Sequence, residues 1–330
     1  MDVRLVTLEL VNPWKIAHGA STERETVIVE LDDSVGEAAV VPYLGESADD
    51  IRSAIYNTWA DGLPQGDGGE HEGLGISSTS LGARCALDLA LHDADARRRG
   101  VPLWNAIGIS SVAPFETSFS IAMDTPDEMA ARARASGASI LKLKMGGPDD
   151  EACVEAVRGA TNATLRLDAN GGWSRETAAQ IIPRLARFKI ELVEQPLTVR
   201  DREGFAWLRA QGLGVPMFAD ESAGSIAEID ELAAHIDGVV IKVRKLGGIK
   251  PAIAAIARAR AHGLRTMIGC MIESSLAVTA AAHLAPLCDL ADLDAPLLIR
   301  NDPFVGLSYH GTTCHLPTAA GIGVLPRAPR

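Results

Sequence analysis

The stretch Ile140-Leu141-Lys142-Leu143-Lys144-Met145-Gly146 places two lysines in an otherwise apolar run. Side chains alternate between the two faces of a β-strand, so Lys142 and Lys144 project from the same side of the strand predicted here. Buried parallel strands normally consist of unbroken Val, Ile and Leu, and two buried ammonium groups are costly unless other groups pair with them. The stretch is therefore either an edge strand with a solvated lysine face or a buried strand that serves a functional site.

Similar short apolar runs recur on both sides of this stretch, and helix-periodic segments such as Pro126–Ser136 and Arg175–Phe188 fill most of the gaps. Eight strands that alternate with helices over about 180 residues favour a (β/α)8 barrel of the TIM type over a doubly wound sheet. The predicted strands are Thr117–Ala122, Ile140–Met145, Thr164–Asp168, Ile190–Glu194, Met217–Asp220, Gly238–Val243, Arg265–Ile272 and Leu290–Asp294.

Residues 1–112 have a different pattern, which predicts an α+β capping domain in front of the barrel. The barrel then covers residues 113–297, and residues 298–330 are expected to return to the capping domain. Within the capping domain we predict strands at Val3–Leu10 and Thr26–Leu31, helices at Asp49–Asp61 and Ser80–Arg99, a loop at Ala17–Glu25 and a mobile Gly-rich loop at 63–78.

The composition is that of a globular protein, with 47% hydrophobic and 22% charged residues in a chain of 330. A net charge of −12 argues against nucleic acid or an anionic membrane as partner. No uncharged apolar run reaches the roughly 18 residues of a membrane span, and no secretion signal is recognised at the N-terminus. The five cysteines are scattered without CxxC spacing, so we expect reduced thiols and a cytoplasmic protein.

Ionisable residues follow seven consecutive predicted strands, at the end where barrels carry their functional side chains. Asp168, Glu194 and Asp220 end three adjacent strands, so their carboxylates can converge on one point. Each alone could be the N-cap of the following helix. Together, three hard oxygen ligands without Cys or His suit Mg²⁺, with Mn²⁺ as the alternative.

Lys144 and Lys242 lie on strands on either side of this acidic set. Two bases that face each other across a bound carboxylate suit proton transfer at the α-carbon. One lysine removes a proton, the metal stabilises the enediolate, and the other lysine returns a proton to the opposite face.

The motifs as a set resemble the enolase superfamily, in its muconate-lactonizing-enzyme-like subgroup. They are A-L-D-L-A-L-H-D-A at 86–94, K-L-K at 142–144, L-D-A-N at 167–170, E-Q-P at 194–196, A-D-E-S at 219–222 and I-K-V-R-K-L-G-G at 241–248. The resemblance implies a lysine-and-Mg²⁺ mechanism with the residues named above in those roles. It also implies that Lys142 lies beside the substrate carboxylate, and that Asn170, Glu221 and Glu273 surround the site. Thr117, on the first predicted strand, is a further candidate for substrate contact.

The segment Asp292-Leu293-Asp294-Ala295-Pro296 distinguishes among the reactions of the subgroup. Two carboxylates one residue apart can hold a cation, and this pattern resembles the one with which dipeptide epimerases bind the substrate's α-ammonium group. The resemblance implies epimerisation of the C-terminal residue of L-Ala-L-Xaa-type dipeptides, by a protein that can form homo-oligomers. The alternatives are o-succinylbenzoate synthase, N-acylamino-acid racemase, or a barrel that binds a metabolite without turning it over.

The side-chain preference at the second residue of the dipeptide stays open. Ala-Glu epimerases carry an arginine at a position that falls near Gly19 here, and Arg24 lies a few residues further on. Glu46 would instead favour a cationic side chain, whereas Tyr43 and Trp14 would favour an apolar one.

Overall fold

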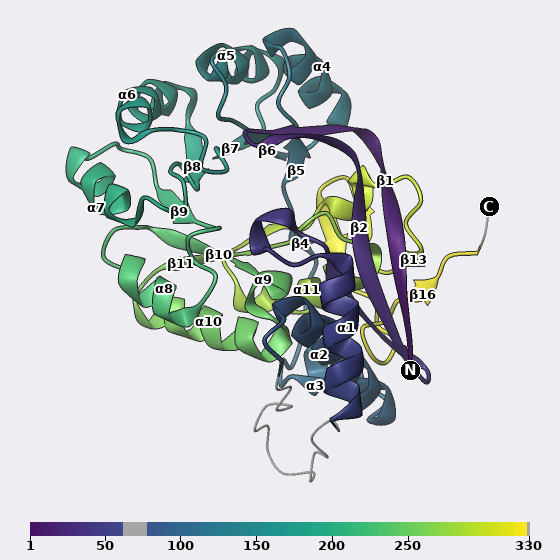
Figure 1. Ribbon diagram of the computed structural model, residues 1–330. Helices are drawn as coiled ribbons and strands as arrows, with labels where there is room; N and C mark the ends of the chain where they lie inside the picture. Colours follow the sequence, from purple (N-terminus) through teal and green to yellow (C-terminus); the bar gives the residue numbers. More distant parts are fainter. Residues whose placement is uncertain (62–77, 329–330) are drawn as a thin grey trace.

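The computed structural model describes residues 1–61 and 78–328 (Figure 1). Within these residues, the centre of the molecule is a parallel sheet of eight strands in the order β12-β11-β10-β9-β8-β7-β6-β5. These are β5 (Phe119–Ile121), β6 (Ile140–Lys144), β7 (Thr164–Asp168), β8 (Ile190–Glu194), β9 (Met217–Ala219), β10 (Gly238–Lys242), β11 (Arg265–Gly269) and β12 (Leu290–Asp292). Each lies inside one of the predicted runs.

The two edge strands of this sheet, β5 and β12, lie next to each other. Thr117 and Ala291 form a parallel bridge, and the backbone N–H of Ser118 donates to the Ala291 carbonyl at 3.2 Å. Strand residues that point inward, such as Leu192, Phe218, Val240 and Met267, form a fully buried cluster. The sheet is thus a nearly closed barrel with a packed interior, which confirms the predicted fold class.

Helices follow the strands and cover the outside of the barrel (Figure 1). The α4 helix illustrates how the sequence sets their limits: the Thr125 side chain caps its first turn, Pro126 opens it, and Gly137 ends it with a φ of 60°. The helical elements are α4 (Pro126–Ser136), α5 (Asp150–Ala160), α6 (Arg175–Leu185), η2 (Ala186–Phe188), α7 (Arg202–Gln211), α8 (Ile226–Leu232), α9 (Val243–Leu246), α10 (Ile249–Ala261), α11 (Ser275–Ala282), η3 (Ala285–Leu287) and η4 (Ala295–Leu298).

The N-terminal unit is an antiparallel sheet in the order β1-β2-β3 with helices packed against it. Gly36 of β3 is required there, because a Cβ atom at this position would lie 1.9 Å from the Ala86 carbonyl of α2. The elements are β1 (Asp2–Ile16), β2 (Gly19–Leu31), β3 (Ser34–Ala39), η1 (Pro42–Leu44), α1 (Ala48–Ala60), α2 (Leu81–Arg98) and α3 (Leu103–Ala106).

The predicted loop at Ala17–Glu25 is wrong. The pairing of β1 with β2 continues from Asp2↔Glu30 to Ile16↔Gly19, with an irregularity between Glu9 and Trp14. Many residues of this ribbon are exposed, which explains why a paired strand has the polar composition of a loop. Figure 1 shows the far end of the ribbon lying across the barrel. The Gly-rich loop predicted at 63–78 lies, except for Ser78, outside the described residues.

The last segment of the chain runs back along the N-terminal unit. The Asn301 side-chain amide donates to the Thr7 carbonyl at 2.9 Å, and the Ile322 N–H donates to Asp93 Oδ1 at 2.6 Å. These contacts support the division that we propose, into 1–112, 113–297 and 298–330. Small sheets complete the fold, formed by β4 (Phe115–Glu116), β13 (Phe304–Val305), β14 (Ser308–His310), β15 (Thr313–His315) and β16 (Leu325–Pro326). Among the described residues, no helix has the length and apolar character needed to cross a membrane.

Candidate active site

Three fully buried carboxylates lie at the carboxyl ends of adjacent strands. Asp168 ends β7, Glu194 ends β8, and Asp220 directly follows β9. The register pairs Asp168 with Glu194, so the parallel sheet itself places these side chains next to each other.

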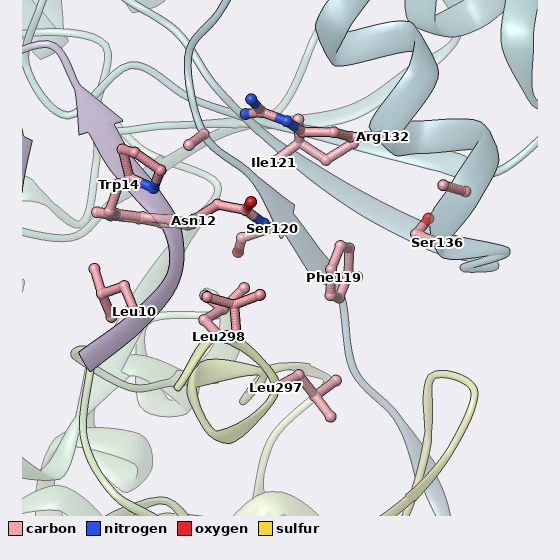
Figure 2. Close-up of a pocket in the computed structure, with 14 residues that line it drawn as sticks. Leu10, Asn12, Trp14, Phe119, Ser120, Ile121, Arg132, Ser136, Leu297 and Leu298 are labelled. Atoms are coloured by element: carbon pink, nitrogen blue, oxygen red, sulfur yellow. The ribbon is translucent and has the colours of Figure 1, made fainter. Parts of the chain in front are cut away.

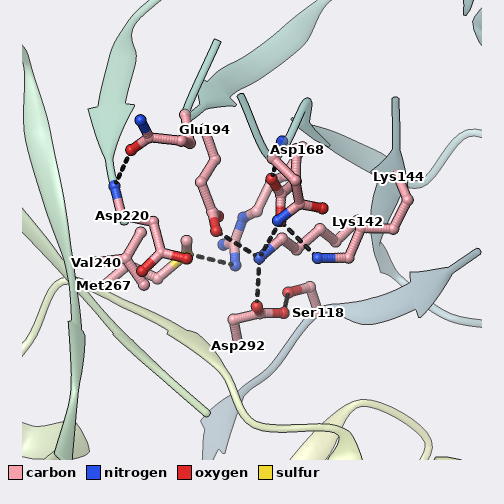
Figure 3. A network of polar contacts seen from close by, with 12 residues as sticks. Ser118, Lys142, Lys144, Asp168, Glu194, Asp220, Val240, Met267 and Asp292 are labelled. Carbon is pink, nitrogen blue, oxygen red and sulfur yellow. Dashed lines mark hydrogen bonds and ion pairs between the residues drawn. The ribbon is translucent and has the colours of Figure 1, made fainter. Parts of the chain in front are cut away.

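The Lys142 ammonium lies among these carboxylates (Figure 3). Its Nζ atom is 2.8 Å from Glu194 Oε1, 2.7 Å from Asp292 Oδ2 and 3.1 Å from Asp168 Oδ2. Burial alone lowers the pKa of Lys142, but the surrounding carboxylates outweigh burial and raise this pKa well above its usual value. Lys142 is therefore a buried cation between the carboxylates that end β7, β8 and β12.

Lys144 and Lys242 face the site from opposite walls of the barrel. Lys144 Nζ donates to Asp168 Oδ2 at 2.6 Å, and Lys242 Nζ donates to Asp220 Oδ2 at 2.7 Å. Their strands, β6 and β10, are separated by β7, β8 and β9 on one side and by β11, β12 and β5 on the other. A molecule bound in the barrel mouth would therefore have one lysine on each side.

Asp168, Glu194 and Asp220, which we call the acidic set, offer the kind of ligand atoms that a hard divalent cation prefers. All of its donors are carboxylate oxygens, and Glu194 Oε2 is buried with no hydrogen-bond partner among the described residues. Burial and the neighbouring Asp168 raise the pKa of Glu194 well above its usual value, so the site favours an added positive charge. In the described ranges no three His, Cys, Asp or Glu side chains are gathered as metal ligands. Asp168, Glu194 and Asp220 are instead paired with Lys144, Lys142 and Lys242.

Asp292 and Asp294 lie at the seam between β12 and β5. Asp292 Oδ1 accepts a hydrogen bond from Ser118 Oγ at 2.5 Å, and Asp294 Oδ2 accepts one from the Ser120 N–H at 2.6 Å. The strand ends at Asp292, so Asp294 lies in the turn before η4 rather than on the predicted strand. Burial and the charge of Asp292 raise the pKa of Asp294 to about 7.

Thr117 and Glu273 both lie beside the cavity that the lysines and aspartates face, rather than in its lining. Thr117 is fully buried, and its hydroxyl accepts the Leu293 N–H at 2.7 Å within the seam. Its contact with substrate stays a prediction. Glu273 was expected at the end of its strand, but β11 stops at Gly269, and Glu273 accepts the Met271 N–H at 3.2 Å.

Asn170 and Glu221 both line the cavity, as expected for residues around the site. The Asn170 N–H donates to Asp168 Oδ1 at 2.9 Å, and its side-chain amide donates to Glu221 Oε1 at 3.1 Å. They link the acidic set to the loop that follows β9.

A cavity of about 390 Å³, which we call the catalytic cavity, is lined by the three lysines and the aspartate pair of the site together with Asn170 and Glu221, whereas Asp168, Glu194 and Asp220 lie behind this lining. The capping domain closes it: Ile16, Gly19 and Arg24 line it from the β1–β2 ribbon, and Tyr43 lines it from η1. Glu46 does not face it, because its carboxylate is held by Arg244 at 2.9 Å and by the Gly82 N–H at 3.1 Å. This removes Glu46 as a group that would select a cationic substrate.

Sequence reasoning missed several contacts of the site. Trp14 lies over Lys144, with the ammonium 5.7 Å from the centre of the indole ring. Lys245 donates to Asp220 Oδ1 at 2.9 Å. The β10 strand ends at Lys242, and the α9 helix that follows turns Arg244 toward the capping domain, where its Nε donates to the Ala39 carbonyl. Gly247 ends α9 with a φ of 83°.

Comparisons with known proteins agree with this geometry. Residues 125–329 match the family model described as enolase C-terminal domain-like. The chain is 37% identical to the L-Ala-D/L-amino acid epimerase of Pedosphaera parvula, over 91% of each chain. It resembles the substrate-liganded L-Ala-D/L-Glu epimerase of Bacillus subtilis, with a TM-score of 0.90 and 32% identity over 99% of this chain and 98% of that one. It also resembles a dipeptide epimerase of Cytophaga hutchinsonii complexed with Mg and D-Ala-L-Val, with a TM-score of 0.88 and 27% identity over 98% of this chain and 95% of that one.

Proposed function

Because this chain belongs to the enolase superfamily and, within it, to the dipeptide epimerases, we propose that it inverts the α-carbon of the C-terminal residue in L-Ala-L-Xaa-type dipeptides. Such an enzyme is an isomerase. The observation that carries the proposal is that one cavity holds two lysines on opposite walls and a pair of aspartates at its β12 side. The lysines suit proton transfer to either face of a carbon atom, and the aspartates suit a free α-ammonium group.

The proton transfer assigned to Lys144 and Lys242 is balanced. The lysine on one side, as a free amine, takes the α-proton and becomes an ammonium group. The lysine on the other side, as an ammonium group, gives its proton to the opposite face of the same carbon and becomes an amine. After the product leaves, the ammonium group loses a proton to water and the amine gains one, which restores both lysines for the next turnover in the same direction. Trp14 lies over the Lys144 ammonium group at 5.7 Å.

We assign Asp168, Glu194 and Asp220 as ligands of Mg²⁺, and Mn²⁺ would suit the same oxygens. The buried position of Lys142 between carboxylates supports this assignment, since a positive charge is already stabilised there. When bound, the ion would neutralise negative charge that develops on the substrate carboxylate as the α-proton leaves. Lys142 would then bind the same carboxylate from the other side.

At the other end of the substrate, Asp294 and Asp292 would hold the α-ammonium group. An N-acylamino acid and the precursor of o-succinylbenzoate have no such group. The aspartate pair therefore favours a dipeptide substrate over the substrates of both alternative reactions. Arg24 supports an acidic second residue, because it lines the catalytic cavity and has no acidic partner among the described residues. Burial lowers the pKa of Arg24, as expected for a guanidinium group that lacks such a partner.

We further propose a cytoplasmic location, since all five cysteines are free thiols in the structure.

The proposed function is tested by incubating the purified protein and Mg²⁺ with L-Ala-L-Xaa dipeptides and separating the products by chiral chromatography. We expect L-Ala-D-Xaa to form, with loss of activity in EDTA and recovery on adding Mg²⁺. Conversion of N-succinylamino acids instead of dipeptides would support the racemase alternative. Calorimetric binding of a dipeptide without any product would support the non-catalytic barrel.

A further inference from the structure

The residue between the two aspartates of the site, Leu293, is held at both of its backbone polar groups. Its N–H donates to Thr117 Oγ1 at 2.7 Å, and its carbonyl accepts a hydrogen bond from the Tyr309 hydroxyl at 2.7 Å. Leu293 is fully buried, so water does not replace either partner. We call the hydroxyl groups of Thr117 and Tyr309 the Leu293 clamp.

Both hydroxyls of the clamp depend on one small sheet, in the order β14-β15-β4. Tyr309 lies on β14 and pairs with Cys314 of β15. Thr117 directly follows β4, and its N–H donates to the Thr312 carbonyl at 2.9 Å. Since β14 and β15 belong to residues 298–330, the last segment of the chain supports the aspartate pair as well as contacting the capping domain.

The clamp bears more on Asp294 than on Asp292. The Asp292 side chain is fixed by Lys142 Nζ at 2.7 Å and by Ser118 Oγ at 2.5 Å. Among the described residues Asp294 has no such ion pair, and its carboxylate accepts the Ser120 N–H at 2.6 Å. The place of the Asp294 carboxylate therefore depends more strongly on the backbone that carries it.

The element that follows Asp294 is loosely packed on one side. Leu297 and Leu298 of η4 line a cavity of about 280 Å³ on the outward side of β5, together with Phe119 and Ile121 (Figure 2). Side chains that border a cavity lack packing partners across it. The hydrogen bonds to Leu293 and Asp294 thus connect this turn to the chain around β5 where side-chain packing does not.

We propose that Tyr309 and Thr117 are positioning residues, which hold Asp294 through Leu293 where it can bind the α-ammonium group of a dipeptide. The inference rests on the proposed function, in which Asp294 and Asp292 bind that group. This role needs no contact between the clamp and the substrate. Burial raises the pKa of Tyr309 well above its usual value, so its hydroxyl stays protonated and remains a donor at neutral pH.

Tyr309→Phe tests the clamp, because it keeps the ring and leaves the Leu293 carbonyl without this donor. We expect KM for the best L-Ala-L-Xaa dipeptide to rise about fivefold or more, with kcat changed by less than about twofold. Thr117→Val should act in the same way through the Leu293 N–H, and Thr117→Ser should restore the wild-type KM because it keeps the hydroxyl. The matched control is Thr313→Val, which removes a hydroxyl of β15 that binds Glu116 and should change neither constant.

A double-mutant cycle with Asp294→Asn separates positioning from general support of the fold. Because Tyr309 acts through Asp294, Tyr309→Phe should raise KM by less than about twofold in the Asp294→Asn protein. An equal rise in KM with and without Asp294 would overturn the inference. So would a normal KM in both Tyr309→Phe and Thr117→Val, including the case in which only their thermal midpoints fall. Absence of dipeptide epimerisation by the wild-type protein would instead refute the proposed function itself.

Discussion

The Lys142 ammonium lies 2.7 Å from Asp292 Oδ2 and so joins β6 to the seam at β12. The charge of Asp292 is thereby balanced before any substrate arrives, and Lys142 holds the pKa of Asp292 below its usual value despite burial. Asp294 makes no ion pair among the described residues, and its carboxylate accepts the Ser120 N–H. The two aspartates of one short motif therefore have different roles, with Asp294 as the group that gains most from the substrate's ammonium.

Asp294→Asn should lower kcat/KM for dipeptides about 100-fold or more, because a buried charge pair that loses one partner costs roughly 2–5 kcal/mol. Asp292→Asn should instead disturb Lys142 and lower the thermal midpoint as well as the activity. Kinetics and thermal melts on both variants would check this. A normal KM in Asp294→Asn would refute the assignment of Asp294 to the ammonium group.

The pH dependence of kcat/KM should show the ionisation of Asp294. Its pKa is raised to about 7, so below this pH the carboxyl is protonated and neutral and loses its attraction for an ammonium group. We expect this protonation to lower kcat/KM about tenfold for each pH unit below 7, in addition to the loss caused by protonation of the lysine that acts as base. Glu273, whose pKa is also raised to about 7, is the control. The acidic limb should become shallower by about tenfold per pH unit in Asp294→Asn and keep its slope in Glu273→Gln, and the opposite pattern would count against this account.

Replacing either catalytic lysine with methionine, which keeps the volume of the side chain, should reduce epimerisation by about 10³-fold or more. Because we propose that the lysines serve opposite faces, each variant should still exchange the α-proton of one epimer but not of the other. Proton NMR in D₂O with the pure L-L and L-D dipeptides measures this directly. Exchange of both epimers by Lys144→Met would mean that one lysine can serve both faces.

Arg24 should discriminate between charged and neutral side chains of equal size. A charge-assisted hydrogen bond contributes about 1.5–3 kcal/mol, so wild-type protein should prefer L-Ala-L-Glu over L-Ala-L-Gln by tenfold or more. Arg24→Gln should remove this preference. Arg4→Gln, on the same sheet but paired with Glu30 at 2.8 Å, is the matched control. An equal loss on both dipeptides would show that Arg24 only supports the ribbon.

The barrel could be predicted because short buried apolar runs alternate with helix-periodic segments, and several of the runs end in a polar residue, as Leu167 and Asp168 illustrate. The ion pairs of Lys142 with the acidic set could not be predicted from the sequence. Strand alternation fixes the side on which a lysine projects, but not which carboxylate it reaches. The place of Thr117 in the seam could not be predicted, because a hydroxyl that closes a seam and one that contacts a ligand have the same sequence signal. The prediction of a loop at Ala17–Glu25 was wrong because the strand residues in this part of the β1–β2 ribbon are mostly exposed and polar on both faces.

The most direct test of the central claim is α-proton exchange with a library of L-Ala-L-Xaa dipeptides in D₂O. Protein with Mg²⁺ is incubated with free dipeptides and with the same dipeptides N-acetylated, and mass spectrometry detects the gain of one deuterium. We predict uptake at the C-terminal residue of free dipeptides only, and its loss in Asp294→Asn. Uptake by N-acetylated or N-succinylated compounds, with none in the free dipeptides, would contradict the assignment of the Asp292–Asp294 pair and with it the epimerase function.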